Sequence, residues 1–109
     1  MKKIFAAILC VAAVCASFAG CGGSQSSSDT IKIGIFEPAS GANGAGGKQE
    51  TLGVKYAHDV QPTVEIDGKT YKIELVEVDN QSADDKAVTA AAELVTKKVS
   101  VVLGSYGSS

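Results

Sequence analysis

Apolar residues alternate with polar ones at the start of the region that we expect to fold. The segment IKIGIF (31–36) carries isoleucine at every second position, which is the period of a strand with one buried face. Residues 48–60 instead carry apolar side chains at every fourth position, at Leu52, Tyr56 and Val60. This spacing predicts a helix whose apolar stripe faces a sheet.

A β-hairpin is predicted between residues 63 and 78. The dipeptide Asp67-Gly68 separates two short runs of β-forming residues and is a strong signal for a two-residue hairpin turn. The second arm continues as YKIELVEV (71–78), whose end becomes apolar, as is typical of a buried strand.

A second helix and a last strand follow the hairpin. Ser82 and Asp85 have the spacing of a capping box, so we expect the helix to begin there. Its apolar face is predicted to consist of Val88, Ala91, Ala92 and Val95. The segment VSVVL (99–103) is predicted to be a strand.

The order of these elements predicts an α/β fold with a doubly wound parallel sheet, β-α-β-α-β with an inserted hairpin. The first strand is then expected between the other two parallel strands. Loops after the first and third strands, 37–47 and 104–109, would meet at the carboxyl ends of the strands, where such folds bind ligands. Since a parallel sheet needs cover on both faces, we expect this piece to be incomplete, with a complete three-stranded mini-domain as the alternative.

The glycine-rich loop does not match a nucleotide site. Its glycines stand at 41, 44, 46 and 47, which fits neither G-x-G-x-x-G nor the P-loop pattern G-x-x-x-x-G-K-[ST]. Ala42 occupies the first glycine position of the P-loop, and Gln49 occupies the position of the hydroxyl that binds Mg²⁺.

The first residues have the pattern of a secretory signal. Two lysines precede an apolar run of about 16 residues, shorter than the roughly 20 that a membrane-spanning helix needs. The stretch SFAGC resembles a bacterial lipobox, so we expect a signal peptide (1–20), lipidation of Cys21 and a Gly/Ser tether (21–29). The predicted location is the outer side of the cell membrane, held by the lipid anchor. Plain secretion with Cys21 as a free thiol is the alternative.

Charge excludes one class of partner. The chain has a net charge of −2, contains no arginine, and beyond residue 21 carries eight lysines against 12 acidic residues. A nucleic-acid partner is not expected, because such a protein needs a basic face. An anion bound here would have to be held by lysine, hydroxyl groups or backbone N–H groups.

The chain resembles the leucine/isoleucine/valine-binding type of ABC-importer solute-binding protein. The resemblance rests on the lipobox and on three motifs that occur in order: IKIGIFEPASGANGAGGKQETLGVKYA, ELVEVDNQSADDKAVTAAAELVTKKV and VVLGSYGSS. The resemblance implies a type I periplasmic-binding-protein lobe, with residues 30–109 as the first part of the N-terminal ligand-binding lobe. It also implies that the protein binds a small amino acid between two lobes and delivers it to ABC permease subunits. It implies no catalysis and no cofactor.

The resemblance places the ligand's α-carboxylate on the turn after the third strand. The positions carried over are Tyr106, Gly107 and Ser108, with Ser109 and Ser105 beside them. A run of glycine and serine that opens a helix presents N–H and hydroxyl groups to an anion. No metal site is expected.

Two alternatives stay open at this point. One is an exported α/β sensor or enzyme that uses Asp79 or Lys48, although no histidine lies near a serine or cysteine to form a nucleophile–base pair. Under the solute-binding interpretation, Asp79 and Asn80 shape the turn before Ser82, and His58 lies exposed on its helix. The other alternative is a truncated fragment without function.

Overall fold

The computed structural model describes residues 29–107 of the chain. The predicted signal peptide, Cys21, and the predicted ligand residues Ser108 and Ser109 lie outside this range. The described elements, in chain order, are β1 (Thr30–Glu37), α1 (Gly44–Val60), β2 (Thr63–Ile66), β3 (Lys69–Asp79), α2 (Asp84–Thr96) and β4 (Val101–Leu103).

The strands form one sheet in the order β2-β3-β1-β4. β1 pairs in parallel with both β3 and β4, so the prediction that the first strand lies between the other two parallel strands is confirmed. β2 pairs antiparallel with β3 and makes the sheet mixed at that edge. The hairpin turns at Asp67 and Gly68, whose φ angles of 52° and 76° are those that a two-residue hairpin turn requires.

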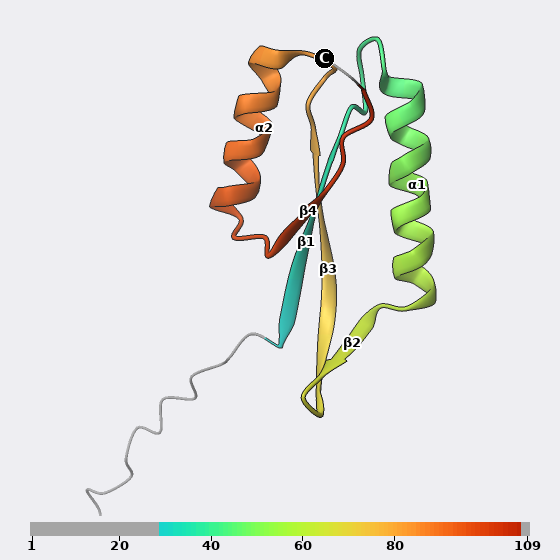
Figure 1. The fold of residues 1–109 in the computed structure, drawn as a ribbon, viewed down its shortest axis with the longest axis vertical. Helices are drawn as coiled ribbons and strands as arrows, with labels where there is room; N and C mark the ends of the chain where they lie inside the picture. Colours follow the sequence, from blue (N-terminus) through green and yellow to red (C-terminus); the bar gives the residue numbers. More distant parts are fainter. Residues whose placement is uncertain (1–28, 108–109) are drawn as a thin grey trace, which may run out of the picture.

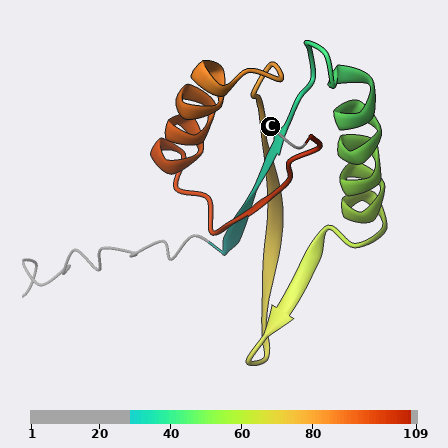
Figure 2. The same cartoon turned by 45° about the horizontal axis from the view of Figure 1, so that its top comes forward.

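The two helices cover opposite faces of the sheet, with α1 on one side and α2 on the other (Figures 1 and 2). This arrangement follows from the topology, because β3 and β4 flank β1 on opposite sides and right-handed crossovers then place their helices on opposite faces. The described residues are therefore a partial doubly wound α/β fold, as predicted.

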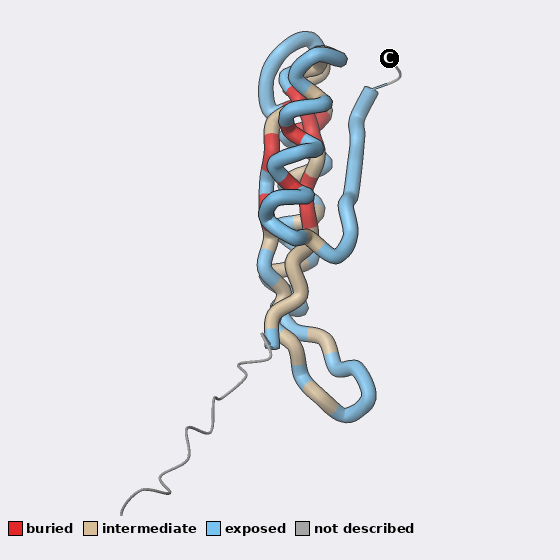
Figure 3. Tube along the Cα trace, turned by 90° about the vertical axis from the view of Figure 1, so that its left-hand side faces the viewer, coloured by how far each residue is buried: buried red, intermediate tan, exposed pale blue. Residues whose placement is uncertain are grey.

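An apolar cluster lies between α2 and the sheet. Its buried members are Val76, Val78, Ala90 and Leu94, with Phe36 and Val99 packed against them. Gly34 of β1 allows this contact, because a Cβ there would lie 3.1 Å from both methyl groups of Leu94. The buried segments are drawn in red in Figure 3.

The predicted apolar face of α1 is wrong. Leu52, Tyr56 and Val60 are 65%, 73% and 69% exposed, and the sheet-facing side of the helix instead carries Thr51 and Val54. The cause is the close contact at the start of the helix. A Cβ on residue 47 would lie 2.2 Å from the carbonyl oxygen of Pro38, so Gly47 must face the loop that leaves β1, and this sets the rotation of the helix.

The predicted face of α2 is wrong in the same way. Val88 and Val95 are exposed, whereas Ala90 and Leu94 are buried against β1 and β3. Regular spacing identified the helix correctly, but α2 carries apolar residues on more than one side, and contact with Gly34 selects the side of Leu94.

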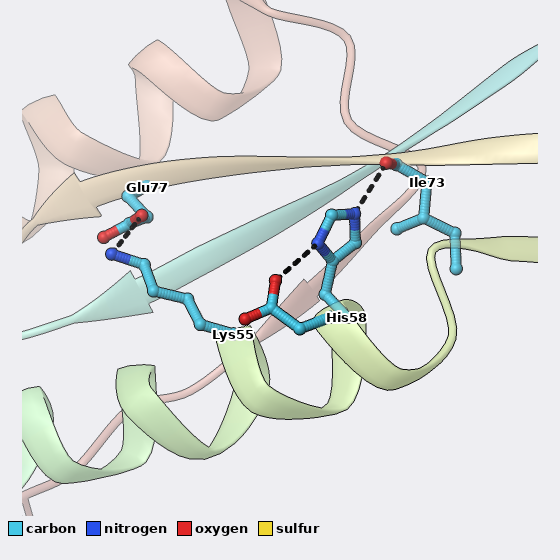
Figure 4. Close-up of polar contacts among 5 residues, drawn as sticks. Lys55, His58, Ile73 and Glu77 are labelled. Atoms are coloured by element: carbon cyan, nitrogen blue, oxygen red, sulfur yellow. Dashed lines mark hydrogen bonds and ion pairs between the residues drawn. The ribbon is translucent and has the colours of Figure 1, made fainter.

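Polar contacts join α1 to β3 along the other face of the sheet (Figure 4). Lys55 Nζ lies 2.8 Å from Glu77 Oε1, and His58 Nε2 donates a hydrogen bond of 3.0 Å to the carbonyl oxygen of Ile73. His58 is therefore half-buried and faces the sheet, which corrects the expectation that it is exposed.

β4 is shorter than predicted, three residues in place of five, and its side chains are exposed. Among residues 29–107, neither helix has both the length and the apolar character needed to cross a membrane.

Candidate functional site

Three loops lie together at the carboxyl ends of the parallel strands, at the upper end of Figure 1. They are the loop after β1 (38–43), the loop after β3 (80–83) and the turn after β4 (104–107), which we call the ligand turn. The sequence predicted that the first and third of these would meet, because parallel strands end at the same edge of a sheet.

Asp79, the last residue of β3, holds the loop after β1. Its Oδ1 atom accepts hydrogen bonds from the backbone N–H groups of Ala39 (2.8 Å) and Ser40 (3.3 Å), and its Oδ2 atom accepts one from Ser40 Oγ (2.7 Å). Oδ1 also accepts the N–H of Gln81 at 2.8 Å. The carboxylate therefore fixes two loops relative to each other.

These hydrogen bonds determine the ionisation of Asp79. Desolvation by itself would raise the pKa of this carboxyl, but the bonds from Ser40 Oγ and from the N–H groups of Gln81, Ala39 and Ser40 outweigh it and lower the pKa below its usual value. Because both oxygens accept bonds from the loops, Asp79 stabilises a turn, as the solute-binding interpretation expected. Residues 29–107 contain no group of three or more histidine, cysteine or acidic residues placed to hold a metal ion.

Ser82 does not form the predicted capping box. α2 begins at Asp84 after Ala83, and no side chain caps it. The Ser82 hydroxyl instead donates to the carbonyl oxygen of Ser40 (2.9 Å) and accepts the N–H of Asn43 (2.9 Å). The hydroxyl thus joins the same two loops as Asp79, because the φ angle of +56° at Ser82 takes the chain out of capping geometry.

Asn80 connects the loop after β3 to the ligand turn. It is 6% exposed, and its Nδ2 atom donates a hydrogen bond of 2.9 Å to Ser105 Oγ. Its Oδ1 atom accepts the N–H of Ser82 at 3.0 Å, which supports the left-handed conformation of that residue.

Glu37, the last residue of β1, holds the ligand turn from below. Its side chain is 4% exposed, and its Oε2 atom accepts the backbone N–H of Tyr106 at 2.7 Å. Burial raises the pKa of Glu37; the bond from Tyr106 opposes this shift, and the neighbouring Glu50 adds to it. The Tyr106 N–H therefore bonds to the protein itself, which leaves the Tyr106 ring as the group that this residue presents at the surface.

The glycines of the first loop have a packing role. Gly44, Gly46 and Gly47 lie in the first turn of α1. The loop after β1 therefore ends at residue 43, whereas the sequence predicted a loop over 37–47. A Cβ on residue 46 would lie 2.3 Å from Cε1 of the Tyr106 ring. The helix can thus contact the ligand turn closely because residue 46 has no side chain.

Gly107 lies beside Asn43. A Cβ at residue 107 would be 3.0 Å from Asn43 Nδ2, so the amide of Asn43 is a polar group at the ligand turn. A cavity of about 130 Å³ lies here, and Asn43, Asn80, Ser105, Tyr106 and Gly107 are among its lining residues. Its volume is below the roughly 300–1,000 Å³ of complete small-molecule sites.

Larger cavities lie along the faces of the sheet, and the one beside α1 extends to the polar cluster, because Glu37, Ala39 and Asp79 are among its lining residues. One of about 460 Å³ lies between α1 and the sheet, and another of about 570 Å³ lies between α2 and β4 and is mainly apolar. They occur where the helices leave the strands uncovered, so volume alone does not locate the site.

The structure thus brings three of the five predicted ligand residues, Ser105, Tyr106 and Gly107, to the edge where the loops meet. Ser108 and Ser109 lie outside the described residues. Sequence reasoning missed the roles of Glu37 and Asn43. A usable signal was present for Glu37, a polar residue directly after a buried strand and before a proline, since such strand ends face the binding edge of the sheet.

Comparisons with known proteins agree with this geometry. The sequence profile of a family described as periplasmic binding protein matches residues 30–109. Among solved structures, the leucine-binding protein LivK of Thermotoga maritima is 32% identical, with a TM-score of 0.61 over 68% of this chain and 20% of that chain. A comparison with curated proteins found no match.

Two further solved structures are similar. One is the branched-chain amino acid transporter substrate-binding protein LivJ of Streptococcus pneumoniae, solved with isoleucine, at 38% identity and a TM-score of 0.56 over 69% of this chain and 22% of that chain. The other is an ABC-transporter solute-binding protein of Rhodopseudomonas palustris, solved with 3,4-dihydroxybenzoic acid, at 33% identity and a TM-score of 0.56 over 68% and 20%. The chain spans about a fifth of the length of these structures.

Proposed function

The chain belongs to the periplasmic binding protein family, and we propose that it forms part of an extracytoplasmic solute-binding protein that supplies an amino acid to an ABC importer. The proposed ligand is a branched-chain amino acid or a related small carboxylate. The protein binds and releases this solute without changing it chemically. The observation that carries the proposal is the ligand turn, held by buried polar residues beside the loop after β1.

The chemistry of the turn favours a carboxylate ligand. Ser105, Gly107 and the amide of Asn43 surround the small cavity, and the sequence contains no arginine to take over the role of anion binding. Neutral N–H and hydroxyl donors suit a compact anionic group. The solved structures of the relatives from Streptococcus and Rhodopseudomonas contain isoleucine and a dihydroxybenzoic acid, both of which carry a carboxylate.

The Tyr106 ring supplies an apolar surface next to these donors. It is 45% exposed and lies against Gly46 on α1. In this proposal the ring contacts the ligand beside its carboxylate, and Ser108 and Ser109 stay sequence-based candidates for further hydroxyl donors. The remaining contacts come from the opposite lobe that the family fold implies.

Calorimetric titration of the full-length protein tests the proposal. We expect saturable binding of leucine, isoleucine or valine with a Kd at or below about 1 μM, equivalent to about −8 kcal/mol. Amino-acid amides, which lack the carboxylate, are expected to bind far more weakly. Flat titrations against all branched-chain amino acids and small aromatic acids would contradict the proposal.

The membrane anchor is a separate part of the proposal. The lipobox-like stretch SFAGC supports lipidation of Cys21, followed by a flexible tether. Metabolic labelling of expressing cells with an alkyne fatty acid should mark the wild-type protein and not Cys21→Ala. Equal labelling of both would exclude Cys21 as the anchor, and a release of wild-type protein into the medium would exclude the anchor itself.

A further inference from the structure

We propose that Glu37 is a positioning residue for the ligand turn, and that its carboxylate sets the affinity of the site by holding the backbone of Tyr106. This inference rests on the proposed function, because it concerns the affinity of that same site. Glu37 lies below the turn, so it acts through Tyr106.

The contact is long in sequence and short in space. Glu37 Oε2 accepts the Tyr106 N–H at 2.7 Å across 69 residues of sequence. The acceptor is 4% exposed, and the bond itself is part-buried. Removal of the acceptor therefore leaves the N–H of Tyr106 without the charged partner that fixes its position.

The turn has the shape needed to accept this carboxylate. Gly104 has a φ angle of +129°, and a Cβ on this residue would lie 2.7 Å from Glu37 Oε1 and 2.1 Å from the carbonyl oxygen of Phe36. Only a residue without a side chain allows the end of β4 to approach the end of β1 this closely. The missing side chain at Gly104 therefore allows the turn to come close enough for Glu37 to accept the N–H of Tyr106.

A second hydrogen bond, from Asn80, holds the neighbouring residue of the turn. Asn80 donates to Ser105 Oγ from the end of β3, while Glu37 accepts from Tyr106 at the end of β1. Two adjacent residues of the turn are thus held from two adjacent strands. A ligand that binds to a turn held in this way loses less free energy to ordering the turn, which is the physical source of the expected affinity.

The test compares Glu37→Ala, which removes the acceptor, with Glu37→Gln, which keeps an oxygen at the same distance along the side chain. In the full-length protein we expect Glu37→Ala to weaken leucine or isoleucine binding by about tenfold or more, the effect of losing one hydrogen bond to a charged group. Glu37→Gln should recover most of this loss. Glu74→Gln, an exposed carboxylate on β3 paired with Lys32, is the matched control and should bind as the wild type does.

A second measurement reports on the contact directly and uses only variants that keep the size of the side chain. In the wild-type protein, the NMR shift of the Tyr106 amide proton should titrate with the carboxyl group of Glu37, and this inflection should be absent from Glu37→Gln. Glu50 of α1 and Asp79 of β3 also face this region, so Glu50→Gln and Asp79→Asn identify any contribution from their ionisation. Retention of the inflection in Glu37→Gln would overturn the inference.

The outcomes separate the two proposals. Wild-type binding together with unchanged affinity in Glu37→Ala would overturn the positioning role and leave the proposed function intact. Equal losses in Glu37→Ala and Glu37→Gln would also overturn it, because the acceptor oxygen would then not matter. A wild-type protein that binds no amino acid would overturn the proposed function, and the positioning role with it.

Discussion

Glu37 and Asp79 are register partners at the carboxyl ends of β1 and β3, and each carboxylate accepts hydrogen bonds from a loop that follows a neighbouring strand. Asp79 of β3 holds the loop after β1 through Ala39 and Ser40, whereas Glu37 of β1 holds the turn after β4 through Tyr106. The edge of the sheet is thus organised by acidic side chains at strand ends, and the following predictions test this arrangement.

Removal of the Asp79 carboxylate should loosen both loops. Asp79→Ala leaves the N–H groups of Ala39, Ser40 and Gln81 without their acceptor. We expect the free energy of unfolding to fall by about 1–3 kcal/mol. The fall should lie near the lower value, because water reaches these exposed loops. Urea denaturation of the full-length protein measures the change. Asp59→Ala on α1, whose side chain is 82% exposed, is the control and should have little effect; equal effects of the two variants would contradict the prediction.

Asp79 should also stabilise the fold in a pH-dependent way. Its pKa is lowered in the folded state, so the unfolded chain binds a proton more readily, and its stabilising contribution is present above the usual pKa of about 4 and is lost as the pH falls through the lower, folded-state pKa. The difference in unfolding free energy between wild type and Asp79→Asn should shrink as the pH is lowered below about 4. Denaturant titrations over a pH series would show a constant difference if Asp79 were not linked to folding.

Glu37 should have the opposite linkage. Its pKa is raised in the folded state, so the folded protein keeps the proton to higher pH, and stability falls as the pH rises from about 4.3 through the folded-state pKa. Glu37→Gln keeps an acceptor for Tyr106 without a buried charge. We therefore expect this variant to be at least as stable as the wild type at pH 7. Its stability should also lack the fall with rising pH that the Glu37 carboxyl causes in the wild type. A variant that is less stable than wild type at pH 7 would contradict this account.

Gly46 should be intolerant of a side chain. Gly46→Ala places a methyl group where the ring of Tyr106 lies, and the ring must move, at a cost of about 1–3 kcal/mol in stability or in ligand binding. Gly53→Ala on the same helix is the matched control, because a Cβ there meets nothing within 4 Å. We expect Gly53→Ala to raise stability by about 1 kcal/mol through helix propensity. Thermal unfolding and calorimetry of both variants measure the contrast.

Gly104 should be more sensitive than Gly68, although both have a positive φ angle. Gly104→Ala must fit a methyl group 2.1 Å from the carbonyl oxygen of Phe36, whereas the same change at Gly68 meets nothing within 4 Å and carries only the backbone cost of about 1–2 kcal/mol. Hydrogen exchange should show increased opening of the ligand turn in Gly104→Ala and not in Gly68→Ala. Equal exchange in the two variants would mean that the close contact does not hold the turn.

Local patterns predicted the elements and their order well. The alternation of 31–36, the Asp67-Gly68 turn and the helical spacing of 88–95 each depend on residues within a few positions of one another, so the sequence was sufficient to identify them. The order of the elements then determined the parallel topology, with β1 between β3 and β4. It also placed the loops after β1 and β4 at one edge of the sheet.

Only the tertiary structure decided which side of each helix is buried and which polar groups pair. Both helices carry apolar residues on more than one side, and close contacts at Gly34 and Gly47 select the side that faces the sheet. Ser82 has the spacing of a cap but bonds to Ser40, 42 residues away, and Glu37 bonds to Tyr106, 69 residues away. Such partners depend on how close the strand ends lie in space, which periodicity along the chain does not encode.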